Sequence, residues 1–151
     1  MIMSIGKFCR RNVVCAVPDT TIVDAAQLMR RNHIGDLIVV DSMGAERRPI
    51  GIVTDRDIVV EVVSVGLDPG MVKVGDLLTR PLVTVDEDTG YADTIRLMAA
   101  RGVRRMPVVS KAGLLVGIIS FDDLFHQLGV PLSELSGLAM REIRQEAETR
   151  K

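Results

Sequence analysis

The stretch Gly51-Ile52-Val53-Thr54-Asp55-Arg56-Asp57 has a close counterpart in Gly117-Ile118-Ile119-Ser120-Phe121-Asp122-Asp123. Each stretch contains a glycine, two apolar residues, a hydroxyl residue and, three positions later, an aspartate. Two such stretches in one chain of 151 residues indicate an internal duplication.

The duplication extends over most of the chain. One constant register holds from Ile5, aligned with Val74, to Asp41, aligned with Ser110. The register then shortens by three residues within the polar stretch 42–49, where a loop tolerates a change in length. The identical pairs in this register include Gly6/Gly75, Arg11/Arg80, Val14/Val83, Asp19/Asp88, Asp24/Asp93, Leu28/Leu97, Met29/Met98 and Val39/Val108. We therefore expect two similar units, residues 5–68 and 74–129, and a tail, residues 130–151.

Both copies predict the same order of elements, β-α-β-β-α. The expected strands are 13–17, 37–40 and 50–54 in the first copy, and 82–85, 106–109 and 116–120 in the second. A closing helix is expected to start near Asp55 or Phe121 and to stop at Gly66 or Gly129. The valine-rich stretch 58–65 has strand propensity, but its aligned partner 123–128 is a better helix former, so the repeat favours a helix.

The first helix of each copy is expected to be amphipathic. Asp19 and Asp88 are the expected N-caps, and Asp24 and Asp93 would place a carboxylate near the positive end of the helix dipole. The apolar residues at helical spacing, expected on the buried face, are Ile22, Ala25, Ala26 and Met29 in one copy and Tyr91, Ile95 and Met98 in the other.

A unit of this size cannot bury both faces of a small sheet alone. We therefore predict an α/β (α+β) fold in which two units pack with pseudo-two-fold symmetry and leave two clefts between them.

Composition and charge exclude several functions. The net charge is −1, aromatic residues make up 3% and there is no Trp, which argues against a nucleic-acid protein. Cys9, Cys15, His33 and His126 show no zinc-ligand spacing, so we expect no metal. We expect neither a signal peptide nor a membrane span, and therefore a cytoplasmic protein with reduced thiols.

The two hydroxyl–aspartate motifs have two interpretations. Thr54 with Asp57, and Ser120 with Asp123, resemble capping boxes that only start a helix. Alternatively, each carboxylate accepts both hydroxyls of a ribose, and the hydroxyl residue contacts ribose or phosphate. Short motifs are unspecific, so the residues alone favour capping.

The duplicated unit, with its Gly-apolar-apolar-Thr/Ser-x-x-Asp ending, resembles the CBS-domain family (cystathionine-β-synthase domains) paired as a Bateman module. The resemblance implies ribose-binding roles for Asp57 and Asp123, with Thr54 or Ser120 beside them. It also implies that the basic pair before the Met-Pro-Val strand faces phosphates. This pair is Arg104 and Arg105.

The first copy departs from the family pattern in the basic pair, because Gly35 and Asp36 replace both arginines. We therefore expect Asp36 to repel phosphate and the two clefts to be unequal. The adenine-contacting positions that the resemblance implies are Cys15, Val17, Ile38, Thr84, Met106 and Pro107. Each of these is equally an ordinary core position.

The implied function is a regulatory module that senses an adenine nucleotide (AMP, ADP or ATP) or another adenosyl compound and signals to an unidentified effector protein. We expect the protein not to be an enzyme, because its sequence contains no nucleophile elbow, P-loop or dinucleotide-binding fingerprint. The alternative is a dimerisation or scaffold module without a small ligand, and a minor one is nucleic-acid binding through Arg101, Arg104 and Arg105. The tail from Leu132 is expected to form an amphipathic helix that docks on its own chain or on the second subunit of a homodimer.

Overall fold

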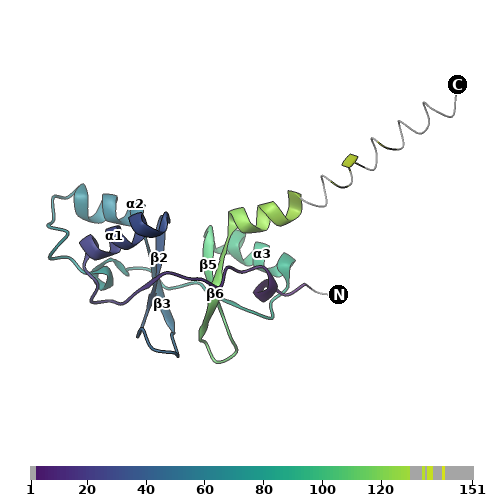
Figure 1. Cartoon of the computed structure of the whole chain (residues 1–151), viewed down its shortest axis with the longest axis horizontal. Helices are drawn as coiled ribbons and strands as arrows, with labels where there is room; N and C mark the ends of the chain where they lie inside the picture. Colours follow the sequence, from purple (N-terminus) through teal and green to yellow (C-terminus); the bar gives the residue numbers. More distant parts are fainter. Residues whose placement is uncertain (1–2, 130–133, 135, 138–140, 142–151) are drawn as a thin grey trace, which may run out of the picture.

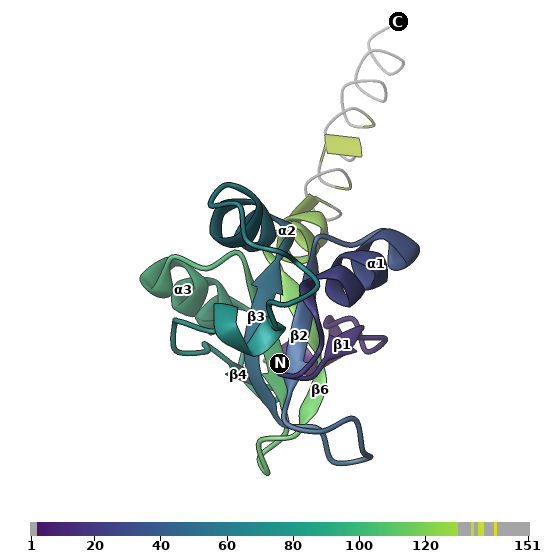
Figure 2. The ribbon, with the colours of Figure 1, turned by 90° about the vertical axis from the view of Figure 1, so that its left-hand side faces the viewer.

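The computed structural model describes residues 3–129, 134, 136–137 and 141. Its described part contains two three-stranded sheets of the same topology, one from each copy of the repeat (Figure 1). Figure 2 shows α1 and α3 on opposite flanks of the strands, as a pseudo-two-fold axis between the copies requires. The predicted α/β (α+β) fold with two tandem β-α-β-β-α units is confirmed.

In the first sheet the short first strand pairs parallel with the middle strand, which pairs antiparallel with the third. The elements of this copy, in chain order, are β1 (Cys15–Ala16), α1 (Ile22–Asn32), β2 (Asp36–Val40), β3 (Pro49–Thr54), α2 (Asp55–Ile58) and the π-helical η2 (Val59–Val63). The valine-rich stretch is therefore helical, as the repeat predicted. Gly66 follows it with φ +74°, a conformation that favours glycine.

The second sheet repeats this arrangement in detail. Its elements are β4 (Val85–Asp86), α3 (Tyr91–Arg101), β5 (Arg105–Val109), β6 (Leu115–Ser120) and a helix over 121–129. Both hairpins carry an irregularity at the same aligned place, between Val39 and Val40 and between Val108 and Val109. Shared irregularities of this kind indicate that the two hairpins descend from one ancestral unit.

The opening segments of the two copies are exchanged. The 3₁₀ turn η1 (Ile5–Lys7) begins the first copy, yet Ile5 is fully buried in the second copy's core. The 3₁₀ helix η3 (Val74–Leu77) begins the second copy, yet Val74 is fully buried in the first copy's core. Each core therefore depends on residues from the other copy.

Equivalent hydrogen bonds hold the exchanged segments. The Ile5 N–H donates to the Thr89 carbonyl at 2.8 Å, and the Val74 N–H donates to the Thr20 carbonyl at 2.8 Å. Next to the second of these bonds, Lys73 Nζ lies 2.7 Å from Asp19 Oδ1. The hydrogen bond from Lys73 lowers the pKa of the Asp19 carboxyl.

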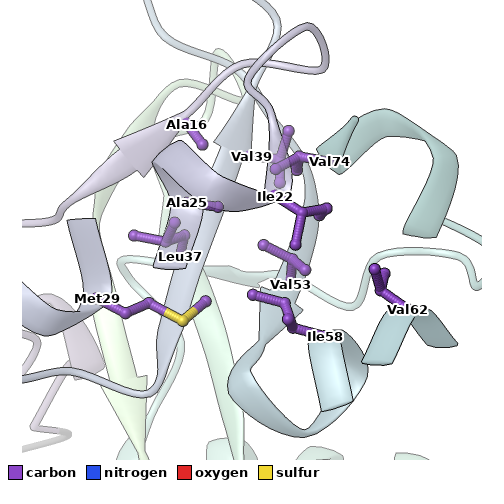
Figure 3. Close-up of a cluster of buried hydrophobic side chains, with 10 residues drawn as sticks. All are labelled: Ala16, Ile22, Ala25, Met29, Leu37, Val39, Val53, Ile58, Val62 and Val74. Carbon is purple, nitrogen blue, oxygen red and sulfur yellow. The ribbon is translucent and has the colours of Figure 1, made fainter. Parts of the chain in front are cut away.

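Three buried clusters form the core. One belongs to each copy, and Figure 3 shows the first, where α1 side chains such as Ile22 and Met29 lie against Leu37 and Val53 of the strands. The third joins the sheets and contains Cys15, Ile38, Val40 and Ile118. The seam between the copies is therefore apolar at its centre.

The expected N-caps Asp19 and Asp88 are wrong, because both helices begin two residues later. Thr21 caps α1, and its hydroxyl accepts a hydrogen bond from the Asp24 N–H at 3.1 Å. Gly90 precedes α3 and has no side chain for this role. The first turns still carry Asp24 and its aligned partner, as predicted.

The buried face of the first helices is rotated slightly from the expected one. Ile22, Ala25, Met29 and Met98 are buried as predicted, but Ala26 is exposed and Ile95 is 37% exposed. Leu28 and Leu97, which were not among the residues expected on the buried face, pack against the two cores.

The structure also bears on the predicted stop of the second closing helix, on the first strand of the second copy and on the tail. The helix over 121–129 includes Gly129, so the predicted stop at this residue is wrong; glycine permits a left-handed φ but does not impose it. The expected strand 82–85 is shifted, because only its last residue joins β4 (Val85–Asp86). The expected amphipathic helix of the tail lies mostly outside the described residues; the tail residues that are described, 134, 136–137 and 141, are helical.

Among the described residues, none of the helices combines the length and apolarity needed to cross a membrane.

Candidate functional site

A cleft of about 620 Å³ lies at the seam between the copies. We call it the first cleft. It is built from the end of β3 and the start of α2, from the segment that leads into the second copy, and from the residues before β5. Its lining residues are Gly51, Ile52, 54–57, Glu61, 77–83 and 103–105. The fold thus places the Thr54–Asp57 motif of one copy opposite the basic pair of the other.

Thr54 and Asp57 form a complete capping box at the start of α2. The Thr54 N–H and hydroxyl both donate to Asp57 Oδ2 at 2.8 Å, and the Asp57 N–H donates to Thr54 Oγ1 at 3.1 Å. Both bonds that the Asp57 carboxylate accepts go to one of its oxygens, Oδ2. The capping interpretation is therefore confirmed, and it leaves Oδ1 of Asp57 for other partners in the cleft.

Ser120 and Asp123 reproduce this arrangement in the second copy. The Ser120 N–H and hydroxyl donate to Asp123 Oδ2 at 2.9 and 2.6 Å, and the Asp123 N–H donates back to the hydroxyl at 3.2 Å. This carboxylate has an additional partner, because Arg10 Nε lies 3.4 Å from Asp123 Oδ2. The second of the two clefts expected from the repeat would lie around Ser120 and Asp123, and we keep the name second cleft for this place.

Arg10 is held beside Asp123 by the backbone as well. Arg10 and Ile118 exchange two backbone hydrogen bonds of 2.9 Å. A Cβ at Gly117 would lie 2.6 Å from Cys9 Sγ and 2.7 Å from the Arg10 carbonyl oxygen. The strand glycine is thus needed for close approach of the chain itself. Gly51 has the same role, because a Cβ there would overlap Leu78, which aligns with Cys9.

Arg104 and Arg105 both line the first cleft, but each has a protein partner. Arg105 Nη1 lies 3.0 Å from Asp36 Oδ1, and these two residues occupy aligned positions, so the ion pair crosses the pseudo-two-fold axis. Arg104 lies 3.9 Å from Asp122 and its guanidinium lies 5.4 Å from the centre of the Phe121 ring. Asp36 is therefore neutralised by Arg105, a pairing that sequence analysis did not foresee.

Two further arginines of the first cleft, Arg56 and Arg80, were missed by sequence analysis. The identity of Arg80 with the aligned Arg11 was an available signal. The lining contains four arginines and three acids, Asp55, Asp57 and Glu61, and two of the arginines have acidic partners outside the lining, so the cleft brings charges of both signs together.

The six implied adenine-contacting residues do not line the first cleft. Cys15, Ile38, Met106 and Pro107 are buried, and Val17 and Thr84 are partly buried. The apolar lining comes instead from Ile52, Leu77, Leu78, Leu82, Val83 and Val103. Cys15 and Ile38 belong to the cluster that joins the sheets, with Val17 packed against it, and Met106 belongs to the second copy's core.

The described residues provide neither a disulfide nor a metal cluster. Cys9 is half-buried and Cys15 is buried, and burial raises the pKa of both thiols. Raised pKa values disfavour the reactive thiolate. In the part of the chain that the structure describes, no three His, Cys, Asp or Glu side chains are grouped to hold a metal ion.

Comparison with known proteins agrees with this architecture. The family model described as "CBS domain" matches residues 5–64 and again residues 74–129. The chain belongs to the CBS domain family. CBS domains account for most of its length, and the two matches coincide with the two sheets and their helices.

Several relatives share this domain pair. An uncharacterised protein of Methanopyrus kandleri, MK0525, is 38% identical over 124 residues, which cover 82% of this chain and 62% of that protein. The chain therefore spans less than two thirds of this relative. Hypoxic response protein 1 of Mycobacterium tuberculosis is 35% identical over 116 residues, covering 77% of this chain and 78% of that protein.

Solved structures show the same fold. The crystal structure of Hypoxic Response Protein I, with two coordinated zinc ions, has a TM-score of 0.71 at 32% identity and covers 82% of this chain and 98% of that one. The domain pair of MJ0100, in complex with 5′-methylthioadenosine and S-adenosyl-L-methionine, has a TM-score of 0.73 at 23% identity and covers 87% and 99%. The second likeness shows the fold alone.

Proposed function

We propose that this CBS-domain pair is a regulatory module that binds an adenine nucleotide or a related adenosyl compound in the first cleft. The observation that carries the proposal is the convergence, in one cleft of about 620 Å³, of Asp57 with Arg80 and Arg104. A carboxylate, guanidinium groups and apolar side chains are the partners that a ribose, a phosphate and an adenine ring need, respectively.

Each part of such a ligand has a partner of matching chemistry. The ribose hydroxyls would donate to Asp57 Oδ1, because the capping box uses only Oδ2. Phosphate oxygens would accept from Arg80 and from Arg104, because the contact of Arg104 with Asp122 is long (3.9 Å) and exposed, whereas Arg105 is held at 3.0 Å by the largely buried Asp36. The base would lie against apolar residues such as Ile52 and Val83. Binding would join the two copies, and a different affinity for two states of the module would transmit the signal.

A thermal-shift screen with AMP, ADP, ATP, NAD and S-adenosylmethionine tests the proposal. A ligand at about 100 times its Kd stabilises the folded chain by about 2.7 kcal/mol, which is a clear rise in Tm for a domain pair of this size. Guanine and pyrimidine nucleotides serve as matched controls. A flat response to all adenosyl compounds would favour the alternative, a scaffold or dimerisation module, which the complete capping boxes and exposed apolar helix residues also support.

The second cleft should bind this ligand more weakly, because the Arg10 side chain already occupies the carboxylate of Asp123. Arg10→Ala is expected to raise the calorimetric stoichiometry from one ligand per chain towards two, at little cost in stability because the pair is partly exposed. Arg11→Ala, which removes a neighbouring charge without touching Asp123, is the control. If Arg10→Ala abolished binding altogether, Arg10 would be a ligand contact and the two clefts would exchange roles.

A further inference from the structure

The opening segments of the two copies are attached to the module by isolated backbone bridges. Ser4 bridges Gly90, and the aligned residues Lys73 and Thr21 bridge each other in the same way. At this place the attachment therefore follows the pseudo-two-fold symmetry of the two copies.

A further bridge breaks this symmetry. Arg10 and Ile118 exchange two backbone hydrogen bonds of 2.9 Å at the edge of β6. The residues aligned with them are Thr79 and Ile52, and within the described part of the chain these two form no bridge. Both of them line the first cleft instead. The first cleft is thus open at the place where the second copy is bridged.

The chain around Thr79 has a local conformation of its own. The Thr79 N–H donates to the Leu77 carbonyl at 2.9 Å, and Leu78 between them has φ −80° and ψ 69°. These angles are those of an inverse γ-turn, which directs the N–H back to its own segment. The same stretch of the repeat therefore occurs in two states within one molecule, bridged at Arg10 and turned back at Thr79.

The bridged state is held by contacts that can break locally. Besides the two backbone bonds, Arg10 has the ion pair with Asp123, and the two side chains are 56% and 25% exposed. Cys9 is half-buried and lies directly against Gly117. Exposed hydrogen bonds and few buried contacts are typical of segments that open without global unfolding.

We propose that the segment 9–11 is a gate of the second cleft. In the bridged state it covers the edge of β6 and holds Asp123. When it turns back as at Thr79, it frees both for a second molecule of the ligand. What enters the cleft rests on the proposed function, whereas the gate rests on the asymmetric bridge.

Opening of the gate changes the connection between the two copies. The chain at this point runs from η1 in the second copy's core to β1 in the first sheet (Figure 1). A ligand that binds only the open state shifts the population of the gate towards that state. Occupancy of the second cleft would therefore move the segment that joins the copies.

Thiol labelling of Cys9 tests the gate without any ligand. A Cβ at Gly117 would lie 2.6 Å from Cys9 Sγ and 2.7 Å from the Arg10 carbonyl oxygen, so Gly117→Ala should displace the segment from β6. We expect this variant to label at Cys9 about tenfold faster or more, because labelling follows the population of the open form. Cys15 is 7% exposed and should label slowly in both proteins, so it serves as the internal measure of global unfolding. Peptide mass spectrometry resolves the two thiols.

Gly51→Ala is the matched control for the added methyl group. A Cβ at Gly51 would also meet the other copy's opening segment, but only at the flexible end of the Leu78 side chain. Cys9 should therefore label at the wild-type rate in this variant. Equal Cys9 rates in Gly117→Ala and the wild type, or equal acceleration of Cys9 and Cys15, would overturn the gate.

Calorimetry with AMP as the probe tests what the open gate admits. We expect Gly117→Ala to show a second binding event per chain that the wild type lacks. One AMP per chain in both proteins, together with accelerated Cys9 labelling, would show that the segment moves without controlling binding and would overturn its role as a gate. The absence of AMP binding in both proteins would count against the proposed function and would leave the labelling result standing.

Discussion

Replacing Ile5 by alanine is expected to lower the free energy of unfolding by about 2–5 kcal/mol, the range for a large aliphatic side chain removed from a packed core. Ile5 is fully buried, although it lies near the N-terminus where such a residue would commonly be exposed. It fills the second copy's core beside Met106 and Ile119. Chemical denaturation of the variant and the wild type measures the difference.

The exchange of opening segments makes this prediction specific. Because Ile5 packs against the second copy, hydrogen exchange in β5 and β6 should accelerate more than exchange in β2 and β3. Val74→Ala should show the reverse pattern, since Val74 belongs to the first core. Met3→Ala, at a largely exposed position, serves as the control and should leave stability within about 0.5 kcal/mol. A loss for Ile5→Ala as small as that of Met3→Ala would contradict the exchanged packing.

Replacing Asp57 by alanine is expected to weaken binding of the adenosyl ligand by about 100-fold or more. The carboxylate would accept two hydrogen bonds from the ribose, and hydrogen bonds to a charged group contribute about 1.5–3 kcal/mol each. The same change removes the capping box of α2, which costs about 0.5–2 kcal/mol of stability. Isothermal titration calorimetry at a temperature well below the variant's Tm separates the two effects.

Asp123→Ala is the matched control for Asp57→Ala. It removes an equivalent capping box and therefore costs a similar amount of stability, but its carboxylate is paired with Arg10 and should not hold the first ligand. We expect affinity for one ligand per chain to remain close to that of the wild type. Equal losses of affinity in both variants would show that the clefts are equivalent, and no loss in either would remove the ribose role from both aspartates.

The capping boxes and the order of elements could be predicted because they depend on residues close together in the chain. Thr54 and Asp57 are three positions apart, a spacing at which the side chain and backbone groups of a helix start meet whatever surrounds them. The duplication corrected local ambiguity, as in the valine-rich η2 (Val59–Val63). The exact start of α1 was predicted wrongly because Thr21 and Asp19 are both competent caps; in the structure Thr21 caps the helix and Asp19 pairs with Lys73, which is far away in the chain.

The residues and their spacing were enough to predict a duplicated α/β unit with a hydroxyl–aspartate pair at the start of each closing helix. The pairing of Arg105 with Asp36, the contact of Arg10 with Asp123 and the position of each opening segment in the other core became visible in the folded chain. The reason is physical. Contacts within one turn follow from local geometry, whereas contacts between residues far apart in the chain follow from how the two sheets pack against each other.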